Sequence, residues 1–191
     1  MDAHAPTLTT ARLRLRPFVL ADAADVCRLA GERAVALPTA AIPHPYPEGA
    51  AEAWIAEHPA LFQAGRGVSL AITLAGSGEL LGTMSLLDIS RPHARAEVGY
   101  WVGLGHWGQG YGTEALRAVM AFGEQHFQVS RFVGRCLASN AGSARVLLKA
   151  GFVAEGRQVQ QVRHPGGWED MLLFGRCTAA RQVAVAAGDP A

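Results

Sequence analysis

Residues 106–115 read "HWGQGYGTEA" and follow a strand-like run, "EVGYWVGLG" (97–105). Six glycines lie between Gly99 and Gly112, and a helical pattern begins where they end. Glycine weakens both strands and helices, so such a cluster normally serves a need of the backbone. A glycine-rich turn that enters a helix offers main-chain N–H groups and the positive end of the helix dipole. The stretch therefore predicts an anion-binding loop, with a turn that merely allows close packing as the alternative.

Part of the same stretch also fits a dinucleotide fingerprint. "GLGHWG" (103–108) matches G-x-G-x-x-G, but in that fold the third glycine already lies in the helix and an acidic residue ends the next strand. Here Gly110 and Gly112 postpone the helix, and the next strand, "RFVGRC" (131–136), has no such acid. No G-K-[ST] follows, which excludes a P-loop. A nucleotide-dependent enzyme is the weaker interpretation.

Composition narrows the class of protein. Half of the 191 residues are hydrophobic, 17% are charged and the formal net charge is +1, which is typical of a globular protein without nucleic acid as a direct partner. The three cysteines form no C-x-x-C pair and the histidines form no cluster, so we expect no disulfide framework and no metal. Without a membrane-length apolar run or a signal-peptide pattern, the expected location is the cytoplasm, away from membranes.

The pattern of apolar residues predicts the order β-α-α-β-β-β-α-β-α-β-β, which is a mixed α/β (α+β) fold with about seven strands. The strand at 94–102, the helix at 113–127 and the strand at 130–138 form one β-α-β crossover, so they predict one parallel pair in a mostly antiparallel sheet. Ligands tend to bind at the C-terminal ends of such strands, where the glycines lie. We expect a single domain over 8–177 and a disordered tail over 178–191.

Several spaced motifs resemble one family. Trp107 to Gly112 matches the two small positions of [QR]-x-x-G-x-[GA], the acetyl-CoA pyrophosphate motif of the GNAT N-acetyltransferase superfamily, with Trp107 in place of Gln or Arg. That replacement is typical of the branch of Rim-type ribosomal-protein N-terminal acetyltransferases. This chain also resembles that branch in four further stretches, "TARLRLRPF" (10–18), "EVGYWV" (97–102), "GTEAL" (112–116) and "NAGSARVLLKAGF" (140–152).

The resemblance implies how the chain would work. It implies a GNAT-like single domain with helices on both sheet faces, whose two parallel strands splay around acetyl-CoA, in a monomer or homodimer. An amine acceptor, either a protein N-terminal α-amine, such as that of a ribosomal protein, or a small-molecule amine, would attack the thioester directly. Gly99 and Gly103 would permit a bulge beside the cofactor. The implied cofactor-binding residues are Tyr100, Trp101, Val102, Trp107, Gly108, Gln109, Gly110, Tyr111, Gly112, Thr113, Asn140 and Ser143.

Two residues are candidates for catalysis. By resemblance, Ser143 would lie near the sulfur and protonate the leaving thiolate; the alternative is an exposed helix residue. Glu97 is the candidate general base, because alternation places it on one strand face with Gly99 and Trp101; the alternative is an ion pair with Arg95 or with an arginine of a neighbouring strand.

The remaining expectations concern Asn140 and the acceptor side. Asn140 precedes a helix, so a simple N-cap is as consistent with the spacing as a contact to the pantetheine arm. The acceptor would enter over the proline-rich loop at 37–49 and the turn at 164–167, with His44, Tyr46 and Trp54 as walls, although Trp54 also fits core packing. A non-catalytic acyl-CoA-binding protein is the alternative function.

Overall fold

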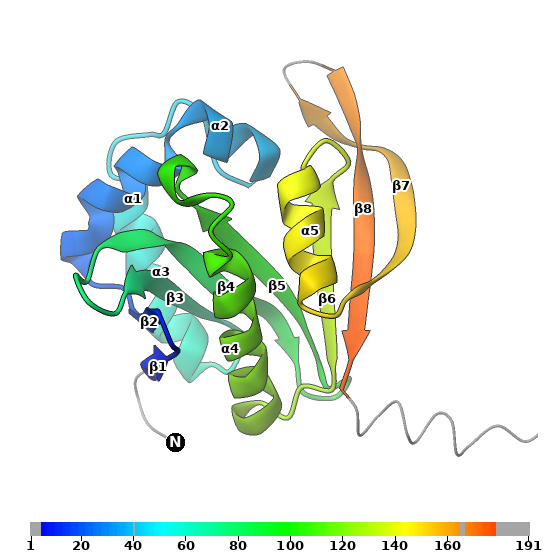
Figure 1. Cartoon of the computed structure of the whole chain (residues 1–191), viewed down its shortest axis with the longest axis horizontal. Coiled ribbons are helices and arrows are strands. Elements are labelled where there is room, and N and C mark those ends of the chain that lie inside the picture. The colour runs from blue at the N-terminus through cyan, green and yellow to red at the C-terminus, as the bar shows by residue number, and fades with distance from the viewer. Residues whose placement is uncertain (1–4, 40, 165–166, 179–191) are drawn as a thin grey trace, which may run out of the picture.

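One continuous sheet organises the chain in a computed structural model that describes residues 5–39, 41–164 and 167–178. Eight strands in this described part follow the spatial order β1-β2-β3-β4-β5-β6-β8-β7 (Figure 1). Every neighbouring pair is antiparallel except β5 and β6, which confirms the mixed sheet with one parallel pair. The additional strand is the two-residue β1. The strands are β1 (Leu8–Thr9), β2 (Leu13–Pro17), β3 (Val68–Leu74), β4 (Leu80–Ser90), β5 (Arg95–Val102), β6 (Arg131–Leu137), β7 (Val153–His164) and β8 (Gly167–Cys177).

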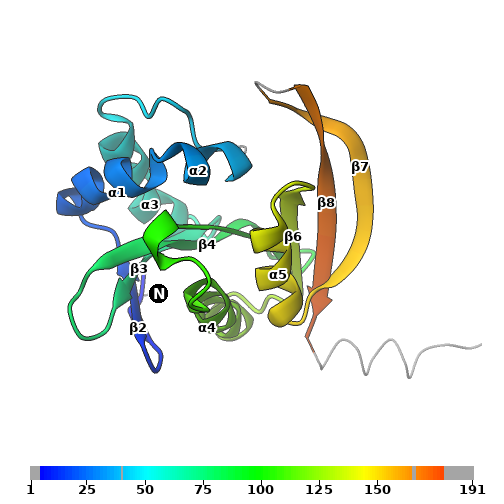
Figure 2. The same ribbon diagram turned by 45° about the horizontal axis from the view of Figure 1, so that its top comes forward.

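Helices cover both faces of the sheet, as expected. Figure 2 shows α1, α2 and α3 on one side of β3 and β4, with α4 on the other side and α5 in front of β6. No helix in the described ranges is long and apolar enough to cross a bilayer. The α-helices are α1 (Ala23–Ala30), α2 (Arg33–Ala36), α3 (Ala50–Gln63), α4 (Tyr111–His126) and α5 (Ala141–Lys149); the short 3-10 helices are η1 (Leu20–Asp22), η2 (Leu37–Thr39) and η3 (Leu104–His106).

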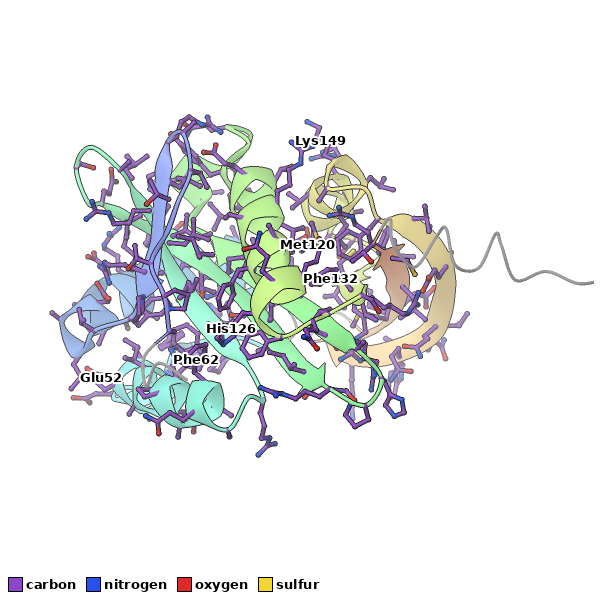
Figure 3. All side chains as sticks on the ribbon, turned by 90° about the horizontal axis from the view of Figure 1, so that it is seen from below. Glu52, Phe62, Met120, His126, Phe132 and Lys149 are labelled. Atoms are coloured by element: carbon purple, nitrogen blue, oxygen red, sulfur yellow. The ribbon has the colours of Figure 1, made fainter. Side chains whose placement is uncertain are left out.

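The larger core lies between the sheet and α4. The side chains of Leu116 and Met120 are fully buried, as is that of Phe132 on β6 (Figure 3). A methyl group at Gly123 would come within 2.7 Å of Leu86, so the absence of a side chain there lets α4 approach β4 closely. Burying each large apolar side chain contributes roughly 1.5–3 kcal/mol, and this packing fixes where α4 begins and ends relative to β5.

The parallel pair separates part-way along its length. β5 pairs with β6 only from Arg95 to Val98, against Arg131–Gly134. Beyond that point β5 continues along β4 to Val102, while β6 continues along β8. The two strands therefore diverge toward their C-terminal ends (Figure 1). We call this divergence, between 99–102 of β5 and 135–137 of β6, the fork.

Some local expectations need correction. The glycines expected to permit a bulge do not: the register shift between β4 and β5 falls between Leu87 and Ser90, and neither Gly99 nor Gly103 has a positive φ. Their role is close packing, because a side chain at Gly99 would meet Leu87 and one at Gly103 would meet Leu29. Most of the turn at 164–167 and the expected tail from residue 179 lie outside the described residues.

Candidate active site

The loop between β5 and α4 has the backbone that its glycines predict at two positions. Gly108 has a φ of 75° and Gly110 a φ of 83°, both in the left-handed region that disfavours every other residue. Gly110 is the N-cap of α4, and the N–H of Glu114 donates the first helical bond to its carbonyl. Gly112 already lies in the helix without a positive φ, and a side-chain carbon there would make only ordinary contact with Val146 and Val102, so neither the backbone nor close packing requires glycine at this third position.

The N-terminus of α4 can receive an anion. The N–H groups at 111–113 precede the first intrahelical bond and point out of the helix end, where the helix dipole favours negative charge. Thr113 is buried, so its side chain belongs to the packing under the loop. The loop therefore acts mainly through its main chain.

Trp107, which replaces Gln or Arg of the family motif, anchors the loop. Its indole N–H donates to the carbonyl of Val102 at 2.6 Å, while the ring stays 48% exposed. The amide of Gln109 adds a bond to the carbonyl of Gly105 at 3.2 Å. The first bond ties the loop to the last residue of β5, and the second joins two residues within the loop.

The main chain of β5 faces the fork at two of the three expected residues, Tyr100 and Val102, whereas that of Trp101 faces β4. The N–H of Gly103 donates to the carbonyl of Leu81 on β4 at 2.8 Å. In an antiparallel pair the main-chain groups alternate in direction, so those of Tyr100 and Val102 point away from β4 and toward the fork. Trp101 points its side chain into the core beneath α1 and α3.

Tyr100 and Ser143 meet across the fork. The phenol oxygen of Tyr100 lies 2.8 Å from the Ser143 hydroxyl oxygen, and the phenol also contacts the Ser143 carbonyl at 3.1 Å. Burial raises the pKa of Tyr100, because a charged phenolate would be poorly solvated there. Burial likewise raises the pKa of the Cys136 thiol, against the effect of a hydrogen bond with Ser143. Ser143 thus belongs to a polar cluster in which the Tyr100 side chain takes part, a contact that no sequence pattern indicates.

Asn140 is the N-cap of α5, as one of its two interpretations predicts. Its Oδ1 accepts from the N–H of Ser143 at 2.9 Å, and its Nδ2 donates to the carbonyl of Pro38 at 3.1 Å. The second bond ties the start of the loop at 37–49 to α5. A contact of Asn140 with pantetheine stays a prediction.

Glu97 is held by an arginine of the neighbouring strand. Its carboxylate accepts two bonds from Arg135 on β6, at 2.9 and 2.7 Å, and the Arg135 side chain is 48% exposed. The predicted alternative, an ion pair across the strands, is therefore what the structure contains. To act as a base Glu97 would have to leave this pair, and its catalytic role stays a prediction.

Of the residues expected to form acceptor walls, Trp54 lies in α3, whereas His44 and Tyr46 lie in the loop that precedes it. Trp54 packs edge-on against Phe18 and His58, with ring centroids 5.1 and 4.3 Å away, which is core packing. His44 contacts the carbonyl of Gly31 at 3.1 Å, and burial raises the pKa of Tyr46. Within the described ranges, no three His, Cys, Asp or Glu side chains gather to hold a metal.

An arginine from the opposite end of the chain also reaches the glycine loop. Arg12, in the turn between β1 and β2, donates to the carbonyl of Gln109 at 3.0 Å and forms an ion pair with Glu114 at 2.7 Å. Its guanidinium lies 4.6 Å from the ring centroid of Tyr111. The alternation in "RLRLRPF" (12–18) predicts a strand with Leu13 and Leu15 inward and the arginines outward, and it does not indicate this contact.

These features coincide with a match to a family model. Residues 12–153 match the model described as an acetyltransferase (GNAT) domain. The chain belongs to the GNAT acetyltransferase family. Its Rim-type resemblance extends to a relative, the ribosomal-protein-serine acetyltransferase of Escherichia coli (strain K12), which is 32% identical over 111 residues, 58% of this chain and 62% of the relative. The chain spans 55–62% of the length of the first curated relatives that it matches.

Solved GNAT structures share the fold over almost the whole chain. RimJ of Mycobacterium smegmatis, in complex with CoA-disulfide, is 25% identical with a TM-score of 0.80, covering 97% of this chain and 96% of its own. A ribosomal L7/L12 α-N-protein acetyltransferase, RimL, in complex with coenzyme A is 22% identical with a TM-score of 0.82, covering 92% and 99%. At that identity RimL demonstrates the shared fold alone.

Proposed function

We propose that this GNAT chain is an acetyl-CoA-dependent N-acetyltransferase that moves an acetyl group to a primary amine by direct attack on the thioester. The observation that carries the proposal is the fork between β5 and β6, which opens beside a left-handed glycine loop at the N-terminus of α4. CoA in complexes of proteins with this fold supports the choice of co-substrate.

In this proposal the main chain binds most of the cofactor. The pyrophosphate would lie on the N–H groups of 108–113, and the pantetheine arm would follow the main-chain groups of Tyr100 and Val102 that face the fork. An N–H of this strand near Val102 would stabilise the oxyanion that develops on the thioester carbonyl. Lys149, Arg117 and Arg176 line a surface pocket of about 310 Å³ together with Glu124, and their excess of positive charge supports binding of the 3′-phosphate there.

The reaction needs one proton to move from nitrogen to sulfur. The amine nitrogen bonds to the acetyl carbon, the carbon–sulfur bond breaks, and CoA leaves as a thiolate. Ser143, in contact with Tyr100, would supply the proton to the thiolate and regain one from solvent. The proton lost by the attacking nitrogen would pass to a base, with Glu97 as the candidate.

The state of Glu97 favours an α-amine as acceptor. An amine attacks only when it is neutral, and an α-amine with a pKa near 8 is roughly 10% neutral at pH 7, whereas lysine is below about 0.1% neutral. Because both carboxylate oxygens of Glu97 accept hydrogen bonds from Arg135, Glu97 is engaged in an ion pair, and the site suits an acceptor that needs little help in losing a proton. We therefore favour a protein N-terminus, and the relative that acts on a ribosomal protein supports it.

An acceptor panel tests the proposal. Purified protein would be incubated with acetyl-CoA and with peptides that start with serine, alanine or threonine, with N-terminally blocked peptides that contain lysine, and with small polyamines. We expect thiol release with free peptide N-termini and an acetyl group on the terminal nitrogen by mass spectrometry. Turnover of polyamines alone would overturn the choice of acceptor.

A non-catalytic acyl-CoA-binding protein is the second candidate, because the Glu97–Arg135 pair removes the nearest predicted base from immediate use. Calorimetry separates the two. Tight CoA binding without thiol release for any amine would favour the binding protein.

A further inference from the structure

The Arg12 guanidinium bonds both to Gln109 in the glycine loop and to Glu114 in the first turn of α4. Its Nε and Nη2 both bind Glu114 Oε2 at 2.7 Å, and its Nη1 donates to the carbonyl of Gln109 at 3.0 Å. Arg12 and Glu114 are 102 residues apart in sequence, and they belong to the motifs "TARLRLRPF" and "GTEAL". The contact thus connects a predicted strand with a predicted helix, and the sequence pattern of neither one indicates that the two segments meet.

Glu114 presents a problem for an anion site. A carboxylate in the first turn suits the dipole of an empty helix, but it would repel a pyrophosphate at the same helix end. The structure neutralises it. Oε1 accepts from the Thr10 hydroxyl at 2.6 Å and from the Arg12 N–H at 3.0 Å, while Oε2 faces the guanidinium. Burial alone would raise the pKa of Glu114, but the bonds from Thr10 and Arg12 outweigh it and lower the pKa, so the group stays a paired carboxylate.

The bond to Gln109 orients the loop itself. In a trans peptide the C=O and the following N–H point in opposite directions. Because the carbonyl of Gln109 is turned to Arg12, the N–H of Gly110 faces away from the guanidinium. The guanidinium lies beside Gly110, since a side-chain carbon there would be 3.5 Å from its Nη2. Arg12 therefore keeps one carbonyl of the loop away from the side that would receive an anion.

We infer that Arg12 is a positioning residue for the cofactor: it neutralises Glu114 and fixes the Gln109 peptide, and so makes the glycine loop able to accept a pyrophosphate. Its contacts supplement the bond by which Trp107 anchors the same loop to Val102. The inference rests on the proposed function, because it assumes that CoA occupies this loop.

Four variants test the inference: Arg12→Ala, Glu114→Gln, the double variant, and Arg14→Ala as a matched control, because Arg14 is an exposed arginine on β2 in the same motif. CoA affinity is measured by calorimetry. Turnover is measured with acetyl-CoA and with S-acetylpantetheine, which has no pyrophosphate. Since a bond to a charged group is worth about 1.5–3 kcal/mol, we expect Arg12→Ala to weaken CoA binding by about tenfold or more. Turnover of S-acetylpantetheine should stay within about twofold of the parent, as should every value for Arg14→Ala.

The double variant identifies the cause. If Arg12 acts by neutralising Glu114, removing both charges should restore most of the CoA affinity that Arg12→Ala loses. Two results would overturn the inference: unchanged CoA affinity in Arg12→Ala, or an equal loss with both thioesters. A double variant as weak as Arg12→Ala would contradict the neutralisation of Glu114 and assign the loss to the Gln109 peptide. Absence of CoA binding by the parent protein would instead refute the proposed function, so the two failures are distinguishable.

Discussion

Replacing the loop glycines with alanine one at a time identifies the positions at which the backbone conformation requires glycine. The structure predicts that Gly108→Ala and Gly110→Ala are costly, whereas Gly112→Ala and Gly105→Ala are not. Gly108 and Gly110 have φ values of 75° and 83°, and an L-residue in that region costs roughly 1–2 kcal/mol. Steric overlap adds little, because an added carbon finds nothing within 4 Å at Gly108 and only a flexible arginine at 3.5 Å at Gly110.

The cost should appear in one of two measurements. If the loop keeps its conformation, the free energy of unfolding falls by about 1–2 kcal/mol and Tm falls by about 2–8 °C for a domain of this size. If the loop relaxes to negative φ, CoA binding must restore the left-handed conformation, and Kd rises by about 5- to 30-fold. Calorimetry with CoA and thermal unfolding of each variant, carried out together, account for both cases.

Gly112 and Gly105 serve as internal controls. An added carbon at Gly112 would lie 3.5 Å from Val146, which is ordinary contact, and alanine favours a helix. At Gly105 the space is open and φ is not positive. If Gly112→Ala weakened CoA binding as much as Gly110→Ala, our assignment of the backbone requirement to Gly108 and Gly110 would be refuted.

Three further predictions concern side chains. Tyr100→Phe removes the phenol that contacts Ser143, and we expect kcat to fall by about tenfold with a smaller change in the KM for acetyl-CoA; an unchanged kcat would show that this contact does not help Ser143 to act as the acid. Glu97→Gln keeps the shape of the side chain but removes its charge. If Glu97 is the general base, kcat should fall by about 100-fold or more; if it only pairs with half-exposed Arg135, kcat should change little. His58 has two buried ring nitrogens without a partner in the described part of the chain, and burial lowers its pKa to about 4. Because the pKa of His58 in the folded protein is below the unfolded value near 6.5, folding favours the neutral ring, so its contribution to stability is full above pH 6.5 and is lost as the pH falls toward 4. We expect His58→Phe to flatten this part of a profile of unfolding free energy against pH. An unchanged profile would contradict the assignment.

The sequence was most informative where a local rule determines structure. The crossover from strand to helix to strand predicts the parallel pair, and the glycines that precede Thr113 indicate a need of the backbone, which the structure shows as the left-handed φ of Gly108 and Gly110. The N-cap of α5 follows from Asn140 directly. The turn and the N-cap depend on residues within a few positions of one another, and the crossover depends on three consecutive elements of the chain.

Contacts between distant segments were not predictable in the same way. Alternation places Glu97 on a strand face, but it leaves open whether Arg95 or Arg135 is its partner. The contact between Tyr100 and Ser143 spans 43 residues, and it depends on how far β5 and β6 diverge. The sequence also could not assign the role of the glycines at 99 and 103. A β-bulge and the close approach of a neighbouring side chain both favour glycine, so the residue type does not distinguish them.

A structure of the protein with CoA tests the central claim most directly. We predict a pyrophosphate on the main-chain N–H groups of 108–113, a pantetheine arm between β5 and β6, and a sulfur beside the Ser143 hydroxyl. Electron density for CoA outside the fork, or NAD bound in the glycine loop with higher affinity than CoA, would contradict the account.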